Sequence, residues 1–110
     1  MIAKGQLPDS AYYAVIFSSE KSENMDGYLE MDELTMKLAM EQKGYLGYES
    51  LSNGNKTLFI SYWENMDSIQ AWRVNATHQM AKSKAGQWYK RYLSQICLVK
   101  QSHLYENYVG

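Results

Sequence analysis

The sequence predicts one α+β domain built as a ferredoxin-like βαββαβ sandwich, in which two helices cover one face of an antiparallel sheet. Segments rich in β-branched and aromatic residues alternate in that order with segments of helical periodicity. An Asn-Gly pair separates the two middle strands, as in a tight hairpin. A length of 110 residues, 45% of them hydrophobic and 21% charged, suits a single folded domain. We place this domain at residues 10–105, with tails at 1–9 and 106–110.

The first strand and the first helix are expected in the N-terminal half. The stretch Tyr12–Phe17 is β-branched and aromatic, and the polar run SSEKSEN behind it is expected to form a loop. Apolar residues then recur at three- and four-residue spacing, which predicts a helix over Met25–Gln42 that ends at Lys43–Gly44. Three polar residues are candidates to cap its start: Ser22, Asn24 and Asp26.

The two middle strands are expected at Tyr45–Leu51 and Lys56–Trp63. They flank the turn Ser52–Asn55. The Asn53-Gly54 pair in this turn favours the positive φ angles that a two-residue hairpin needs.

A second helix is expected after this hairpin, with Asn65 or Asp67 as its N-cap. Its apolar positions repeat at helical spacing: Ile69, Trp72 and Ala76. The helix is expected to continue to Ala85, with a kink near Thr77, and to stop at a left-handed Gly86. The last strand is expected at Leu93–Lys100, with outer limits at Tyr89 and Tyr105.

The sheet is expected to be covered on both faces. The first strand is apolar on each side, with Tyr12, Ala14 and Ile16 on one and Tyr13, Val15 and Phe17 on the other. In the third strand, Phe59 and Trp63 oppose Leu58, Ile60 and Tyr62. Such strands need a cover on each face, and the two helices supply only one. We therefore expect a homodimer that buries the helix-free face.

Charge and cysteine content exclude several classes of partner. The formal net charge of -1 provides no positive field for phosphates, so neither nucleic acid nor a membrane surface is an expected partner. No signal-peptide core and no run approaching ~20 apolar residues is present, which favours the cytoplasm. The single cysteine, Cys97, has no internal partner and is interpreted as a small core residue.

Several short segments occur in an order and spacing that resemble the antibiotic biosynthesis monooxygenase (ABM) family. They are Gly44 to Glu49 (GYLGYE), Tyr62-Trp63-Glu64, Ala71-Trp72, His78 and Trp88-Tyr89. The resemblance covers nearly all of residues 12–105 and implies a dimeric α/β barrel of ferredoxin-like subunits. Known members include cofactor-independent oxygenases of aromatic polyketides and haem-degrading enzymes, so the fold alone leaves the activity open.

The resemblance assigns Trp72 to the lining of a pocket between the second helix and the sheet, whereas the residue pattern alone fits a core aromatic. Asn75, three residues further on, is a candidate to hold a carbonyl or a peroxide, with a solvated surface position as the alternative. His78 is a candidate proton acceptor for a phenol, or else a surface histidine. Tyr62 and Trp63 are candidate substrate contacts, but strand alternation allows only one of them to face that pocket.

The leading hypothesis is a cofactor-independent monooxygenase that acts on a phenolic or anthrone-like small molecule, which itself supplies the electrons to O2. The alternative is a non-catalytic dimeric module for ligand binding or protein interaction. A third reading, haem degradation, is disfavoured, because the family's axial histidine would fall near Lys82, about one turn past His78, and the first strand lacks the family's Asn. No metal site is expected, since His78 and His103 are 25 residues apart without a paired ligand spacing.

Overall fold

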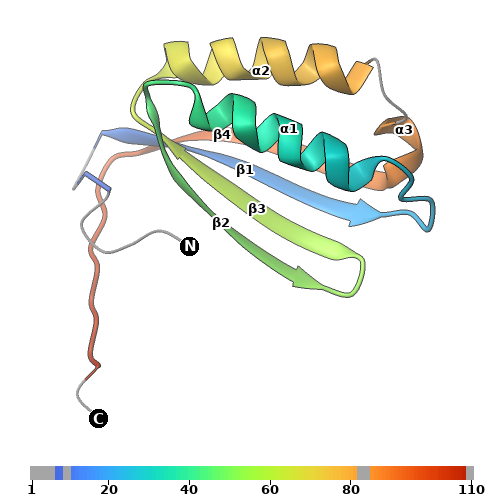
Figure 1. Ribbon diagram of the computed structural model, residues 1–110. Helices are drawn as coiled ribbons and strands as arrows, with labels where there is room; N and C mark the ends of the chain where they lie inside the picture. Colours follow the sequence, from blue (N-terminus) through green and yellow to red (C-terminus); the bar gives the residue numbers. More distant parts are fainter. Residues whose placement is uncertain (1–6, 9–10, 82–84, 109–110) are drawn as a thin grey trace.

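The computed structural model describes residues 7–8, 11–81 and 85–108 of the chain. In chain order its elements are β1 (Tyr12–Lys21), α1 (Tyr28–Met40), β2 (Tyr45–Asn53), β3 (Lys56–Trp63), α2 (Met66–Ala81), α3 (Ala85–Trp88) and β4 (Tyr89–Val99). The four strands form one antiparallel sheet in the order β2-β3-β1-β4. Helices α1 and α2 lie on the same face of that sheet (Figure 1). The predicted ferredoxin-like fold is therefore confirmed.

Strand β1 is longer than its apolar stretch. The predicted loop at residues 18–21 is wrong, because Ser18 and Ser19 pair with β3 on one side and with β4 on the other. A central strand satisfies its backbone groups from both neighbours, and this outweighs the low strand propensity of serine and lysine. The extension carries Lys21 to the far end of the sheet.

The start of α1 differs from the prediction. The helix begins at Tyr28 rather than Met25, and its N-cap is Gly27 at φ 80° without a side-chain cap. The expected caps serve the preceding loop instead: Ser22 Oγ accepts from the backbone N of Asn24 at 3.2 Å, and Asn24 Oδ1 accepts from that of Asp26 at 3.4 Å. These local bonds use up the side chains that could have capped the helix.

The hairpin prediction is confirmed, with a tighter turn. Asn53 pairs with Lys56, so that only two residues form the turn. Gly54 has φ 63°, and positive φ at the first central position suits a type II′ turn.

At the ends of α2 and β4, a predicted cap is confirmed, the predicted stop at Gly86 is wrong, and the end of β4 lies within one residue of the prediction. Asn65 Oδ1 accepts from the backbone N of Ser68 at 2.8 Å, so the predicted cap is confirmed. Gly86 does not stop a helix in the left-handed conformation, because it lies inside α3. Strand β4 runs from the predicted outer limit, Tyr89, to Val99, one residue before the predicted end at Lys100.

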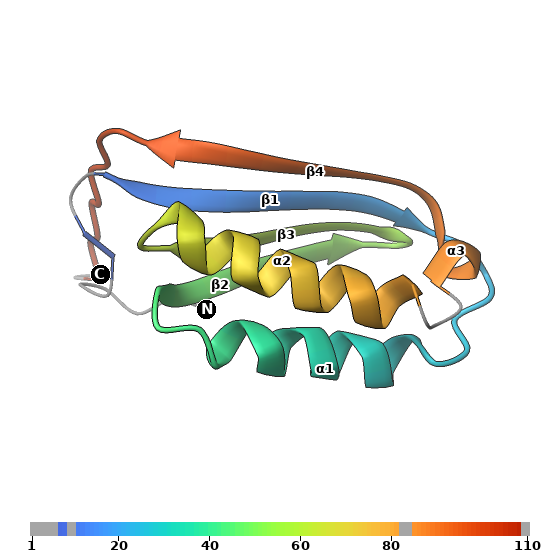
Figure 2. The same cartoon turned by 90° about the horizontal axis from the view of Figure 1, so that it is seen from above.

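Trp88 is buried beside Tyr28 at the α3 end of the space between the helices and the sheet. The main cluster of buried residues lies at the opposite end and consists of Val15, Ala39, Trp63 and Ile69. Gly44 closes this end against α2, since a Cβ at this position would collide with the Ser68 side chain. Viewed from above, α2 lies across the sheet and α1 beside it along β2, whereas β4 runs along the opposite edge (Figure 2). None of the described helices is long and apolar enough to cross a membrane.

Candidate functional site

Two tryptophans form the buried end of the helix-facing side. Trp63 is 0% exposed, and its indole Nε1 donates to Ser61 Oγ at 2.8 Å. The Trp72 ring lies 5.3 Å from it, tilted by 33°, and Tyr45 meets Trp63 edge-on at 5.4 Å. The Tyr45 hydroxyl is buried without a hydrogen-bond partner, and burial raises its pKa. This end is rigid and almost wholly apolar.

Trp72 connects the two helices. Its Nε1 donates to the backbone oxygen of Thr35 on α1 at 3.0 Å, and the side chain is half-buried. Part of the ring therefore remains open while its polar atom is satisfied. The arrangement packs the two helices together.

The other candidates from the sequence are separated from this ring. Asn75 has an exposed side chain, whereas Ala76 beside it is buried, so α2 turns its inward face through positions 69, 72 and 76. The side chain of His78 lies outside the described residues, as does Lys82. The structure therefore brings neither amide nor imidazole to Trp72 within its described part.

Tyr62 and Trp63 lie on opposite faces, as strand alternation requires. Trp63 packs under the helices, whereas Tyr62 lies on the helix-free face beside the Tyr12 ring at 6.0 Å. The Tyr62 hydroxyl donates to Glu49 Oε2 at 2.9 Å. Burial, followed by this bond to a carboxylate, raises the pKa of Tyr62 to about 12. Of the two, only Trp63 shares a face with Trp72.

The helix-facing side is less tightly covered away from the tryptophans. Phe17 and Phe59 sit opposite each other on the two central strands, yet both are only half-buried. Tyr48 stacks on Phe59 at 5.4 Å, and Tyr92 stacks on Phe17 at 5.3 Å while remaining 58% exposed. These rings pack on one another and are only partly covered by the helices.

Charged and phenolic groups meet at the far end of the same surface, in what we call the Lys21 cluster: Lys21, Tyr28, Asp32 and Tyr89. Lys21 Nζ donates to Thr57 Oγ1 at 3.0 Å and lies 4.9 Å from the centre of the Tyr28 ring. Burial raises the pKa of Asp32, while the nearby Lys21 ammonium lowers it. Burial and then the neighbouring Tyr28 raise the pKa of Tyr89 well above its usual value.

This cluster did not emerge from the sequence, because Lys21 was expected in a loop. The signal was present in the alternation of β1, where Tyr13, Val15, Phe17, Ser19 and Lys21 follow one another on one face. Asp32 lies one helical turn after Tyr28, a spacing that brings two side chains to the same helix face.

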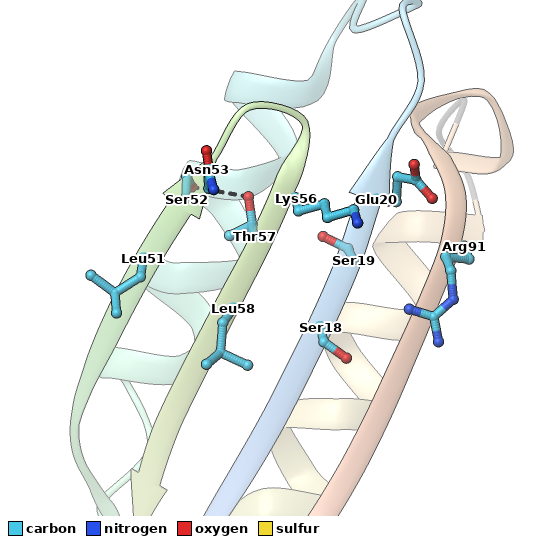
Figure 3. A pocket seen from close by; sticks show the side chains of 10 residues that line it. All are labelled: Ser18, Ser19, Glu20, Leu51, Ser52, Asn53, Lys56, Thr57, Leu58 and Arg91. Atoms are coloured by element: carbon cyan, nitrogen blue, oxygen red, sulfur yellow. Dashed lines mark hydrogen bonds between the residues drawn. The ribbon is translucent and has the colours of Figure 1, made fainter.

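A cavity of about 440 Å³ lies at the hairpin end of the sheet, on the helix-free face (Figure 3). In that view the helices lie behind the sheet. Three charged side chains are among those that line the cavity: Lys56, Glu20 and Arg91. Lys56 and Arg91 are exposed. This cavity is therefore separate from the aromatic surface under the helices.

No group of three or more His, Cys, Asp or Glu side chains is placed to hold a metal ion within the described part of the chain. Within the described residues, the asparagine that the resemblance places on the first strand of haem-degrading members is missing. Strand β1, even in its full length of Tyr12–Lys21, contains no asparagine, and the Nδ2 of Asn24 in the following loop donates to Gln87 Oε1 at 2.9 Å.

The fold is that of a ferredoxin-like α+β protein with partly covered aromatic side chains on its helix-facing side. The model of the family described as antibiotic biosynthesis monooxygenase matches residues 11–84. The chain is 43% identical over 103 residues to the uncharacterized protein YqjZ of Bacillus subtilis (strain 168), which covers 92% of this chain and 90% of that protein. The chain therefore belongs to the antibiotic biosynthesis monooxygenase family.

Solved structures share the fold at low sequence identity. SnoaB, a cofactor-independent oxygenase from Streptomyces nogalater, matches with a TM-score of 0.64 at 9% identity, over 84% of this chain and 97% of SnoaB. NE2512, a protein of unknown function from Nitrosomonas europaea, matches with a TM-score of 0.67 at 10% identity, over 91% of this chain and 100% of that one. Membership of the family supports monooxygenase chemistry at the level of the family.

Proposed function

We propose that this protein is a cofactor-independent monooxygenase of a flat phenolic or anthrone-like molecule. The observation that supports it best is the partly open aromatic surface between the helices and the sheet, with the half-buried Trp72 at its closed end. The deprotonated substrate would supply the electrons to O2. One oxygen atom would enter the product as a carbonyl, and the other would leave as water with the two hydrogens of the oxidised carbon.

In this proposal the protein contributes position and electrostatics rather than a redox group. Trp72, supported from behind by the fully buried Trp63, would hold the flat ring system and exclude water. The donor that stabilises the deprotonated substrate is proposed as Asn75 or His78 on the resemblance, although the exposed side chain of Asn75 weakens its case. Oxygen uptake with a hydroxylated anthrone, and mass spectrometry of the quinone product under labelled O2, test the activity.

Trp72→Ala is expected to lower kcat/KM for such a substrate at least ~10-fold, because a buried aromatic contact is worth more than 1.4 kcal/mol. Trp72→Phe is the matched control: it keeps a ring against Trp63 and loses only the bond to the Thr35 oxygen. It should retain activity within about threefold. Binding and turnover that survive Trp72→Ala in a folded protein would remove Trp72 from the site.

A non-catalytic ligand-binding module is the second candidate, and the satisfied Trp72 indole favours it, since a structural role explains that bond fully. Ligand binding without oxygen uptake would select this reading.

In either case we propose a homodimer paired through the helix-free face. A cytoplasmic location is part of the proposal, supported by the free cysteine Cys97.

Haemin titration should give no saturable complex of one haem per subunit and no sharpened Soret band. The expectation rests on the missing asparagine of β1 and on the engagement of Asn24 with Gln87. A tight complex that His78→Ala abolishes would contradict it and restore the haem reading. His103→Ala, a change in the exposed segment after β4, is the matched control.

A further inference from the structure

The ammonium of Lys21 is held in place but not saturated. It carries three N–H donors, and the described residues provide one acceptor, Thr57 Oγ1, at 3.0 Å. The Tyr28 ring covers another side at 4.9 Å. Lys21 is half-buried, and within the described part of the chain no carboxylate is in ion-pair contact with it.

The backbone around Lys21 is fixed on both sides. Its N–H donates to the Asn55 oxygen at 2.8 Å, and Asn55 Nδ2 donates back to the Lys21 oxygen at 3.3 Å. The hairpin turn between β2 and β3 therefore anchors the end of β1. A cation presented from a rigid strand end loses little freedom when it binds an anion.

A series of aromatic ring contacts leads from Phe17 towards this cation. Thr35, whose oxygen holds Trp72, lies seven residues and thus about 10 Å along α1 from Tyr28. On the sheet side, Phe17 contacts Tyr89 at 5.6 Å, and Tyr89 in turn contacts Tyr28 at 6.3 Å. These contacts end at Tyr28, whose ring lies beside the Lys21 ammonium.

We propose that Lys21 is the anion-binding residue of this site, and that its ligand is a flat aromatic molecule with a negatively charged group at one end, such as a phenolate, carboxylate or sulfonate. The proposal deepens the proposed function, on which it rests for the identity of the substrate. Asp32 is the acidic group facing Lys21 from α1, and Tyr89 faces the same cluster from β4.

A pair of fluorescent probes tests directly whether Lys21 recognises a negative charge on the ligand. Anilinonaphthalenesulfonate and phenylnaphthylamine share one aromatic body, and only the first carries a sulfonate. Lys21→Met should weaken binding of the sulfonate about 10-fold, the usual worth of one charge-assisted hydrogen bond, and leave the neutral probe within about twofold. Asp32→Asn should act in the opposite direction and strengthen only the sulfonate, since it removes a competing negative charge.

Lys56→Met is the matched control, because Lys56 lines the cavity on the other face of the sheet. If Lys56→Met weakens the sulfonate as much as Lys21→Met, or if Lys21→Met weakens both probes alike or neither, the proposal is overturned. Wild-type protein that binds neither probe overturns it as well.

Two further variants keep the proposal testable if Lys21→Met does not fold: Lys21→Arg should keep sulfonate binding, and Lys21→Gln should lose it. Sulfonate binding that depends on Lys21 without any oxygen uptake would reject the monooxygenase and keep the binding site. Oxygen uptake that Lys21→Met leaves unchanged would keep the monooxygenase and reject Lys21 as the anion-binding residue.

Discussion

Trp63→Ala should remove about 4 kcal/mol from the free energy of unfolding, the usual cost of deleting a fully buried aromatic side chain. Trp63 is 0% exposed and contacts both Tyr45 and Trp72, so no neighbour has room to refill the space without leaving its own contacts. A domain of this size is stable by only about 5–15 kcal/mol in total. The urea midpoint should therefore fall by a large fraction.

Two single changes act as controls for this core. Ser61→Ala removes the acceptor of the Trp63 indole and should cost about 1 kcal/mol, the typical value for one hydrogen bond. Tyr45→Phe removes a buried hydroxyl that lacks a partner and should be neutral or slightly stabilising. If Trp63→Ala costs no more than Ser61→Ala, the tryptophan end is not the structural centre of the domain.

The outline of the fold was predictable because it depends on local patterns. Each predicted strand and both main helices occur, and the turn at Gly54 follows from backbone geometry. Errors arose where tertiary contacts override propensity. Ser18 and Ser19 continue β1 because two neighbouring strands pair with them, and the start of α1 moved because Asn24 bonds within its own loop.

The site was less predictable than the fold, because a ligand surface depends on how two layers diverge. The sequence located Trp72 and correctly limited the pair Tyr62 and Trp63 to one residue on the helix-facing side. It could not indicate that Lys21 continues a strand and reaches the Tyr28 ring, since those residues meet only after the layers pack. A lysine in a polar run is interpreted as solvated unless the strand is known to continue.

Leu58→Lys should convert the expected homodimer into monomers, raising the dimer dissociation constant at least ~100-fold, because an ammonium buried without a partner costs several kcal/mol. Leu58 lies on the helix-free face and is 41% exposed in the single chain, with Leu51 at 72% and Leu93 at 43% on the same face. Ile16 and Ile60, a neighbouring cross-strand pair on the same face, are only half-buried. Such a patch on a sheet face is typical of an interface between subunits. Sedimentation or light scattering at micromolar concentration measures the outcome.

Leu29→Lys is the matched control for this change. Leu29 is 70% exposed on α1, on the side of the molecule that carries the helices, so the same substitution there should leave the dimer intact. In a twofold dimer each Leu58→Lys change enters the interface twice, which is why one substitution suffices. A wild-type protein that is monomeric at micromolar concentration would contradict the dimer itself. Dissociation by Leu29→Lys and not by Leu58→Lys would instead move the interface to the helices and leave the apolar sheet face unexplained.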